Sequence, residues 1–314
     1  MYTRPLSWIL AASLASVAVV PARAGGLSFT VNSDGDKRIE SCSDLQMMFW
    51  KQDRGRDGIV TLRRSQTISL GSDASKPLKV EASERGGIRV QPSLDGSFSA
   101  LVCMAAGARS NDAAQGILDG LRIENSDGEM TVKGPDDTDW AAEIVLSVPA
   151  SATLHLSAMN GGLQLRDVDG HFTLRTTNGP IDLTHASGRV DAQAENGPIH
   201  YRGHSGDVTL AAQNGPIGVD LDAPEWDGKG LDASTQNGPI QLSAPNSMRS
   251  GVEVMGSRSS PATWNGTPQP IQAQGSGSRR YHFGGDPIVV RLSTVNGPVE
   301  IKAPKQRKTR GVTI

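Results

Sequence analysis

The sequence predicts an all-β protein, built as a parallel β-solenoid with coils of about 18 residues. The first observation is a tetrapeptide, Asn-Gly-Pro-Ile, which returns along the chain with a final Asn-Gly-Pro-Val variant and an earlier, looser Asn-Gly-Gly-Leu form. These copies begin at Asn160, Asn178, Asn196, Asn214, Asn237 and Asn296, in steps of 18, 18, 18, 23 and 59 residues. The second observation is the composition, with 36 Gly and 18 Pro but only 4% aromatic residues. Frequent turns and few bulky side chains favour many short strands over long helices.

Residues 1–24 have the pattern of a secretory signal peptide. Arg4 precedes an apolar stretch over residues 9–20, and Ala22-Arg23-Ala24 has the small-x-small form that signal peptidase accepts. We expect cleavage after Ala24 and export, to the periplasm or to the cell surface. A retained membrane anchor is disfavoured because the apolar run is short and is closed by Pro21 and Arg23. No later segment approaches the roughly 20 apolar residues of a membrane span.

Residues 25–57 are expected to form an N-terminal β segment that contains Cys42. The only other cysteine is Cys103. In an oxidising compartment an even pair of cysteines favours a structural disulfide. A zinc site would need further ligands, and no His lies near either cysteine in the sequence. A redox pair would favour a Cys-x-x-Cys spacing, which the chain lacks.

Residues 58–303 are expected to form the solenoid domain. Up to about residue 143, apolar residues alternate with polar ones in short runs separated by Gly-rich turns, a pattern typical of short strands. From Ile144 onward the pattern aligns with itself, and each 18-residue unit reads strand, turn, strand, turn. One such unit cannot bury its apolar face alone, so neighbouring coils must stack.

Stacking of the coils explains why the same four residue types recur in each copy of the tetrapeptide. Equivalent residues of stacked coils lie about 4.8 Å apart, so the Asn side chains are predicted to form a hydrogen-bonded ladder. Gly is expected to adopt backbone angles forbidden to other residues, and Pro to occupy a position without a backbone hydrogen bond. A left-handed hexapeptide helix fits less well because its aliphatic residue should return every six positions, and a calcium-binding β-roll would need carboxylates at the corner. The handedness of the solenoid stays open.

Two insertions interrupt the repeat, and they contain aromatic residues that are rare elsewhere. The first lies at residues 223–230, and the second spans residues 243–287 with one expected strand around Val252 and Val254. The candidate ligand-contact residues in them are Trp226, Trp264, Arg279, Arg280 and Tyr281. They are interpreted either as a stacking platform for a glycan or peptide or as anchors that pin the loops to the solenoid. Residues 304–314 form a basic tail that is expected to be disordered.

Part of the chain resembles a known family. The segment Glu143–Pro149, the Asn-Gly turns after it, and the segment Trp226–Ser234 leading into Asn237 are similar to the bacterial putative-adhesin domain. The resemblance covers roughly residues 59–302. It implies an exported β-solenoid of right-handed, β-helix-like form, and it implies no catalytic residues. The long insertion and the basic tail depart from the family pattern, which leaves the C-terminal coils least defined.

A search for reactive groups yields only weak candidates. An 18-residue register stacks Asp182 with His200, and it stacks His171, Arg189 and Asp207 in a second column that we interpret as a charged structural ladder. His185, His200 and His204 suggest a metal site only faintly, since carboxylate partners are not evident from the sequence. We therefore predict no cofactor and no metal. A net charge of -2 argues against a nucleic-acid partner.

The sequence supports three hypotheses of function. The first is a non-enzymatic, exported structural or interaction protein of the cell envelope, with envelope components, glycans or a second copy of itself as partners. The second is a carbohydrate-active β-helix enzyme or glycan-binding module. An enzyme would need acidic groups that converge in one cleft with Arg189, drawn from Asp182, Asp207, Asp220 and Asp222. The third is an envelope scaffold that self-assembles end to end through exposed terminal coils.

Overall fold

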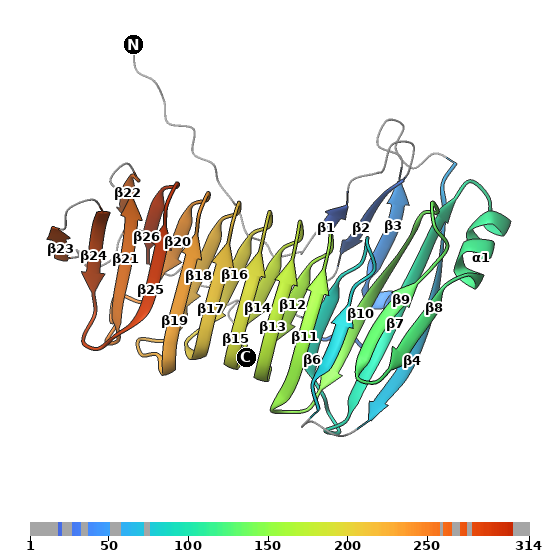
Figure 1. Cartoon of the computed structure of the whole chain (residues 1–314), viewed down its shortest axis with the longest axis horizontal. Coiled ribbons are helices and arrows are strands. Elements are labelled where there is room, and N and C mark those ends of the chain that lie inside the picture. The colour runs from blue at the N-terminus through green and yellow to red at the C-terminus, as the bar shows by residue number, and fades with distance from the viewer. Residues whose placement is uncertain are drawn as a thin grey trace, which may run out of the picture.

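The computed structural model describes residues 18–20, 27–32, 37–50, 58–71, 76–257, 260–265, 271–274 and 278–303. Within them the protein is all-β, as predicted, with three sheets and one short α-helix. The strands of the two large sheets follow one another along the long axis of the molecule, with α1 at one end and β23 at the other (Figure 1). The predicted signal peptide lies outside the described residues except for β1 (Ala18–Val20), and the basic tail 304–314 lies outside them entirely.

A three-stranded antiparallel sheet covers one end of the molecule. It consists of β1, β2 (Ser28–Asn32) and β3 (Gln46–Trp50), and a 3₁₀ turn, η1 (Cys42–Asp44), precedes β3. Its apolar side chains, including Phe29 and Phe49, pack on the outer face of the 11-stranded sheet and form a small second core there. The disulfide between Cys42 and Cys103 joins η1 to that sheet.

The two large sheets enclose the main core. The 11-stranded sheet has the order β22 (Ala262–Asn265), β26 (Val299–Lys302), β20 (Ile240–Ser243), β18 (Ile217–Leu221), β16 (Ile199–Gly203), β14 (Ile181–Thr184), β12 (Leu163–Arg166), β6 (Ile88–Pro92), β10 (Trp140–Val148), β7 (Phe98–Ala108), β4 (Val60–Gly71). The 12-stranded sheet has the order β23 (Ile271–Gln274), β24 (Ser278–Phe283), β21 (Gly251–Ser257), β25 (Ile288–Thr294), β19 (Asp227–Thr235), β17 (Ser205–Ala212), β15 (Ser187–Ala194), β13 (Asp169–Thr176), β11 (Ala152–Ala158), β5 (Leu78–Glu81), β9 (Glu129–Lys133), β8 (Arg122–Ser126).

From β11 to β20 the chain passes back and forth between the two sheets. Each strand pairs in parallel with the strand one coil later. The offset is 18 residues for the earlier pairs, for example Ile181 with Ile199 and Phe172 with Val190, and 23 residues for the last ones, as from Ile217 to Ile240. Along these strands buried and half-exposed residues alternate. The apolar alternation predicted from the sequence therefore places one row of side chains of each sheet in the shared core.

The prediction that residues 58–303 form a parallel β-solenoid is wrong, because both large sheets are mixed. At one end β4, β7 and β10 pair antiparallel, as do β8 and β9. At the other end β21 pairs antiparallel with β24, and β24 with β23. A period of two residues is common to parallel and antiparallel strands, so the alternation could not tell them apart.

The long insertion forms an end cap, although only the strand around Val252 was expected in it. Its strands β21 and β22 lie beyond the last repeated coil, and β23 and β24 extend the 12-stranded sheet further. The chain then turns back, so that β25 pairs with both β19 and β21, and β26 with both β20 and β22. The coil of β25 and β26 thus fills the space between an earlier coil and the cap (Figure 1).

The helix α1 (Asn111–Asp119) was not anticipated from the sequence. Ser110 caps it by accepting a hydrogen bond from the backbone N–H of Ala113 at 3.2 Å. Ala114 and Leu118 are its buried residues, and the helix lies against β4 and β7. A Ser followed by Asn-Asp is a helix-start signal that could have revealed it.

The repeated Gly is required by close stacking rather than by unusual backbone angles. At Gly179, Gly197, Gly215 and Gly238 an added Cβ would collide with the carbonyl oxygen of the Gly one coil earlier, and none of the four has a left-handed φ. The Pro that follows supplies a carbonyl that accepts the N–H of the first residue of a strand in the preceding coil, as from Ile181 to Pro198 at 2.9 Å. The corner therefore continues the ladder of inter-coil hydrogen bonds.

We expect the substitution Gly197→Ala to destabilise the protein by about 1–3 kcal/mol, because two adjacent coils must separate to admit the methyl group. The measurement is the free energy of unfolding in urea. Gly116→Ala is the control, since a Cβ at that position of α1 meets no atom within 4 Å, and it should stabilise the protein by about 0.5–1 kcal/mol. Equal stabilities for wild type and Gly197→Ala would contradict the stacking argument.

Candidate functional site

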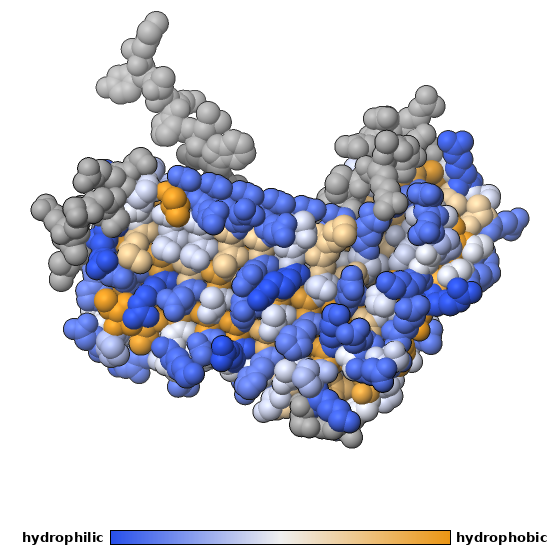
Figure 2. Space-filling model, in the orientation of Figure 1, coloured by the Kyte–Doolittle hydropathy of each residue, from blue (hydrophilic) through white to orange (hydrophobic). Residues whose placement is uncertain are grey.

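A groove of about 600 Å³ runs across the 12-stranded sheet, close to the C-terminal ends of its parallel strands. It runs over six strands, β11, β13, β15, β17, β19 and β25, and so extends for about 24 Å at the usual strand spacing. Its sixteen lining residues are Ser157, Ala158, Arg175, Thr176, Thr177, Gln193, Ala194, Glu195, Ala211, Ala212, Gln213, Ser234, Thr235, Gln236, Ser293 and Val295. Figure 2 shows this face, with a band of weakly polar and apolar side chains along the long axis between hydrophilic rows.

Small, buried residues lie at the floor of the groove. The position two residues before each repeated Asn is always Ala or Thr, and all six are buried: Ala158, Thr176, Ala194, Ala212, Thr235 and Thr294. The hydroxyls of Thr235 and Thr294 donate to the carbonyls of Gly215 and Gly238, each at 2.9 Å. These hydroxyls are therefore bonded into the Gly corners.

The walls of the groove are polar and nearly uncharged. Gln213 and Gln236 are exposed and follow the floor residues directly, while Ser234 and Ser293 lie on the outer face of the sheet. Only two of the sixteen lining residues, Arg175 and Glu195, carry a formal charge. The guanidinium of Arg175 is held by the carboxylate of Asp191, with Nη2 to Oδ2 at 2.9 Å and Nη1 to Oδ1 at 3.3 Å.

A ladder of Asn side chains lies beside the groove. Each Nδ2 donates to the Oδ1 of the Asn one coil earlier, at 2.8–3.1 Å, through Asn160, Asn178, Asn196, Asn214, Asn237 and Asn296. At the start of the ladder Asn160 donates to the backbone carbonyl of Glu84 at 3.1 Å. The ladder holds successive coils in register next to the groove. Each Asn directly follows a residue of the column that borders the groove, which consists of Met159, Thr177, Glu195, Gln213, Gln236 and Val295.

A charged cluster occupies the outer face of the 11-stranded sheet. His200 lies in register with Asp182 on one side and Gly218 on the other, and its ring extends over Gly218 so that Nε2 lies 3.1 Å from Oδ2 of Asp220. Burial raises the pKa of Asp182, and the nearby positive charges of His200 and two arginines offset this only in part. Burial would lower the pKa of His200, but the hydrogen bond and charge of Asp220, with the charge of Asp182, raise it overall.

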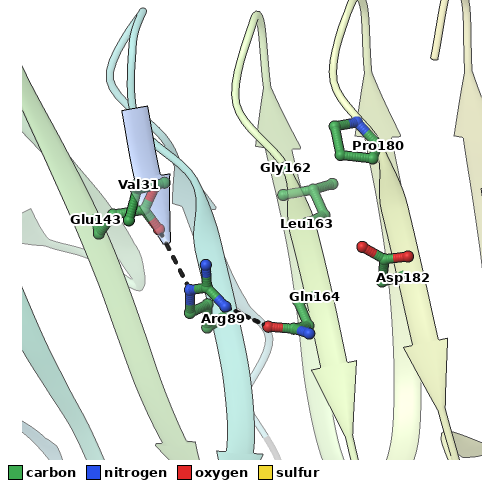
Figure 3. Close-up of a pocket in the computed structure, with 8 residues that line it drawn as sticks. All are labelled: Val31, Arg89, Glu143, Gly162, Leu163, Gln164, Pro180 and Asp182. Atoms are coloured by element: carbon green, nitrogen blue, oxygen red, sulfur yellow. Dashed lines mark hydrogen bonds and ion pairs between the residues drawn. The ribbon is translucent and has the colours of Figure 1, made fainter. Parts of the chain in front are cut away.

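Next to Asp182 there is only a small void. Figure 3 shows Arg89 between Glu143 of β10 and Gln164 of β12, with Asp182 on the neighbouring strand. The void that they line measures about 20 Å³, which is enough for about one water molecule. It is too small for a sugar ring.

The raised pKa of His200 leads to a pH-dependent stability. A folded-state pKa above the unfolded value means that the stabilisation is complete below the ordinary His pKa of about 6.5 and is lost as the pH rises through the folded pKa. We expect the free energy of unfolding to fall less steeply above this pH in a His200→Gln variant than in the wild type. Urea unfolding across the pH range measures this, with His155→Gln, an exposed residue of β11, as control. Parallel curves for wild type and His200→Gln would rule out this role.

The other predicted histidines lie elsewhere. His185 bridges two carboxylates, with Nδ1 2.9 Å from Asp167 and Nε2 2.9 Å from Asp222, and Nδ1 of His204 lies 2.7 Å from Asp222. His200 does not join them. Among the residues that the structure describes, no three His, Cys, Asp or Glu side chains are grouped so that they could hold a metal ion.

The carboxylates named for an enzyme do not converge in one cleft with Arg189. Asp182 and Asp220 flank His200 on the 11-stranded sheet, and Asp222 contacts His185 just beyond β18. Asp207 lies in register with Arg189 on the 12-stranded sheet, where Lys229 pairs with it at 3.2 Å. Arg189 itself lies in register with His171, so the second predicted column is present on the strands.

The structure does not bring the five candidate ligand-contact residues onto one surface. Trp226 is buried, its ring 5.9 Å from that of Tyr201 and its Nε1 donating to the carbonyl of Gly206. Trp264 is half-buried against Tyr281, which is itself buried, with ring centroids 5.1 Å apart. Arg279 and Arg280 are exposed on β24, where Arg280 pairs with Glu253 at 3.3 Å. These aromatic residues anchor the insertions to the core.

The chain has similarity to several solved structures, each with a TM-score below 0.5. A putative adhesin from Parabacteroides merdae ATCC 43184 is 8% identical with a TM-score of 0.39, and the match covers 77% of this chain and 96% of that one. A putative adhesin from Bacteroides fragilis NCTC 9343 is 12% identical with a TM-score of 0.37, covering 78% and 97%. A putative lipid binding protein from Parabacteroides distasonis ATCC 8503 is 10% identical with a TM-score of 0.28, covering 77% and 97%. No family model and no curated protein sequence matches the chain.

Proposed function

We propose that this protein is a non-enzymatic interaction protein of the bacterial cell envelope and that the groove across the 12-stranded sheet is its binding surface. The observation that carries the proposal is the shape and lining of the groove. It is long, it is continuous over six strands, and its walls offer side-chain amides and hydroxyls. Such a surface can bind an extended molecule along the stack of coils.

The chemistry of the groove favours binding over catalysis. Hydrolysis of a glycosidic bond ordinarily uses two carboxyl groups on either side of the bond. Glu195 is the single carboxylate among the lining residues. Asp182 and Asp220, which flank His200, lie on the other large sheet, and the void that Asp182 lines measures about 20 Å³.

Export is part of the proposal and is supported by two independent features. The Cys42–Cys103 disulfide is typical of proteins that fold in an oxidising compartment, and residues 1–24 have the pattern of a cleavable signal. Cleavage after Ala24 would remove β1 and leave β2 and β3 paired with each other. Among the described residues no helix has the length and apolar character needed to cross a membrane.

A substitution that fills the groove tests the proposal. Ala211 lies on the outer face of β17 in the groove, so an Ala211→Trp side chain would obstruct it without entering the core. Thr209→Trp is the matched control, since Thr209 is exposed on the same strand two residues earlier and does not line the groove. We expect Ala211→Trp to weaken binding to envelope fractions at least about tenfold and Thr209→Trp to leave it unchanged.

Binding is measured by co-sedimentation of the mature protein with whole cells and with purified envelope fractions, and circular dichroism verifies that both variants fold. Wild-type binding by Ala211→Trp would show that the groove is not the contact surface. Release of new reducing ends from envelope polysaccharide by the wild type would show that the protein is an enzyme.

A further inference from the structure

We propose that the ligand of the groove is an uncharged, extended polysaccharide that lies along the stack of coils with one sugar unit per coil. This inference rests on the proposed function and adds the chemical class of the ligand and its register. Three features carry it: the repeat distance of the groove, the hydrogen-bonding character of its walls, and its charge.

The groove presents the same kind of surface once per coil. Its strands pair in parallel with equivalent positions in register, so the floor and wall positions recur about every 4.8 Å. An extended β-1,4-linked hexose chain advances by a distance close to this for each sugar, so it can place one ring beside each coil, with successive rings turned over. An extended peptide advances by about 3.3 Å per residue, so its side chains would drift out of register after one or two coils.

The walls suit hydroxyl groups. The amides of Gln213 and Gln236 each offer two donors and one acceptor oxygen, and the hydroxyls of Ser234 and Ser293 can donate or accept. Sugar hydroxyls have the same dual character, so either partner can take either role. The methyl group of Ala211, on the outer face of β17, offers contact to the apolar C–H face of a sugar ring.

The charge of the groove disfavours an acidic polymer. Arg175 is the only cation among the lining residues, and its guanidinium is already bound by two oxygens of Asp191. Glu195 lies exposed near the middle of the groove and would repel a uronate or a phosphate. A neutral chain meets neither penalty.

Exposed apolar side chains mark the two ends of this surface. The column that borders the groove begins at Met159 and ends at Val295, with Thr177, Glu195, Gln213 and Gln236 between them. Met159 and Val295 are 55% and 57% exposed, and they are two of the three large hydrophobic side chains exposed to this degree among the described residues. The column spans six coils, which gives a chain of about six sugars a defined footprint.

Titration calorimetry with oligosaccharides of increasing length tests the inference. The probes are cello-oligosaccharides and N-acetylglucosamine oligomers, which are neutral and extended. Malto-oligosaccharides, which are helical, and oligogalacturonates, which are acidic, serve as contrasts. We expect affinity for the first two to rise with each added sugar and to level off at about six units, with at least about tenfold weaker binding of the contrasts.

The Ala211→Trp variant gives a readout that non-specific binding would not change. It divides the groove and leaves three strands, β11, β13 and β15, uninterrupted, so the length at which affinity levels off should shorten to about three units. Thr209→Trp should keep the wild-type length. Equal affinity for all lengths, or tighter binding of oligogalacturonates than of neutral chains, would overturn the inference.

The two proposals can fail separately. If Ala211→Trp blocks binding to envelope fractions while no neutral oligosaccharide binds the wild type, the groove is the contact surface and its ligand is of another class. If Ala211→Trp leaves binding to the fractions unchanged, the proposed function itself is wrong.

Discussion

The substitution Arg89→Met is expected to destabilise the protein by about 3–5 kcal/mol, because it leaves a buried carboxylate without its counter-ion. Glu143 is 3% exposed, and Nε of Arg89 lies 3.6 Å from its Oε2. Burial raises the pKa of Glu143, while the charge of Arg89 and the backbone N–H of Gly87, 3.0 Å from Oε1, oppose the rise. Without Arg89, the backbone N–H of Gly87 alone would stabilise the charged form of Glu143. Folding should therefore require protonation of Glu143.

Urea unfolding of three proteins separates the pair from its surroundings. The loss of unfolding free energy in Arg89→Met should be smaller at acidic pH, because protonating Glu143 in the folded state then costs less free energy. A double variant, Arg89→Met with Glu143→Gln, should regain much of the lost stability, since no charge is then buried. A single variant as stable as the wild type at neutral pH would show that the ion pair does not stabilise this part of the sheet.

Removal of the disulfide should cost about 4 kcal/mol, since Cys42 and Cys103 are 61 residues apart and the cross-link restricts a long loop of the unfolded chain. Cys42→Ala with Cys103→Ala is preferable to Ser, because Cys103 is buried against the small second core. The measurement is the midpoint of urea unfolding for wild type and double variant, each with and without a reductant. The reductant should lower the wild-type midpoint towards that of the variant and leave the variant unchanged. An unreduced wild type no more stable than the variant would contradict this expectation.

Local repetition explains which parts of the fold could be predicted. Because the tetrapeptide returns at a constant step, the sequence predicts that Asn178 lies beside Asn160 and Asn196, and the structure has both hydrogen bonds. The reason proposed for the Gly was wrong, because its role depends on the distance between two coils rather than on its own φ. The distance between two chain segments cannot be predicted from the type of a single residue.

The groove had a sequence signal that was overlooked. The residue two positions before every repeated Asn is Ala or Thr, so a column of small side chains beside the corner was readable from the sequence alone. Its depth was not, because it depends on wall residues such as Gln213 and Gln236 that follow no strict pattern. The rare aromatic residues drew the prediction towards Trp226 and Trp264, yet large apolar side chains in an insertion most readily serve to bury it.

The position of β25 and β26 determines what a truncation of the chain would remove. The C-terminal ends of domains commonly tolerate shortening, because few contacts hold them. Here the last described strands are interior layers, paired on both sides with segments made earlier. A ribosome therefore completes the end cap before it makes the coil on which the cap rests, and the two halves of the stack can join only after residues 288–302 have been made. Loss of residues 288–303 would open a gap inside the molecule instead of trimming its end.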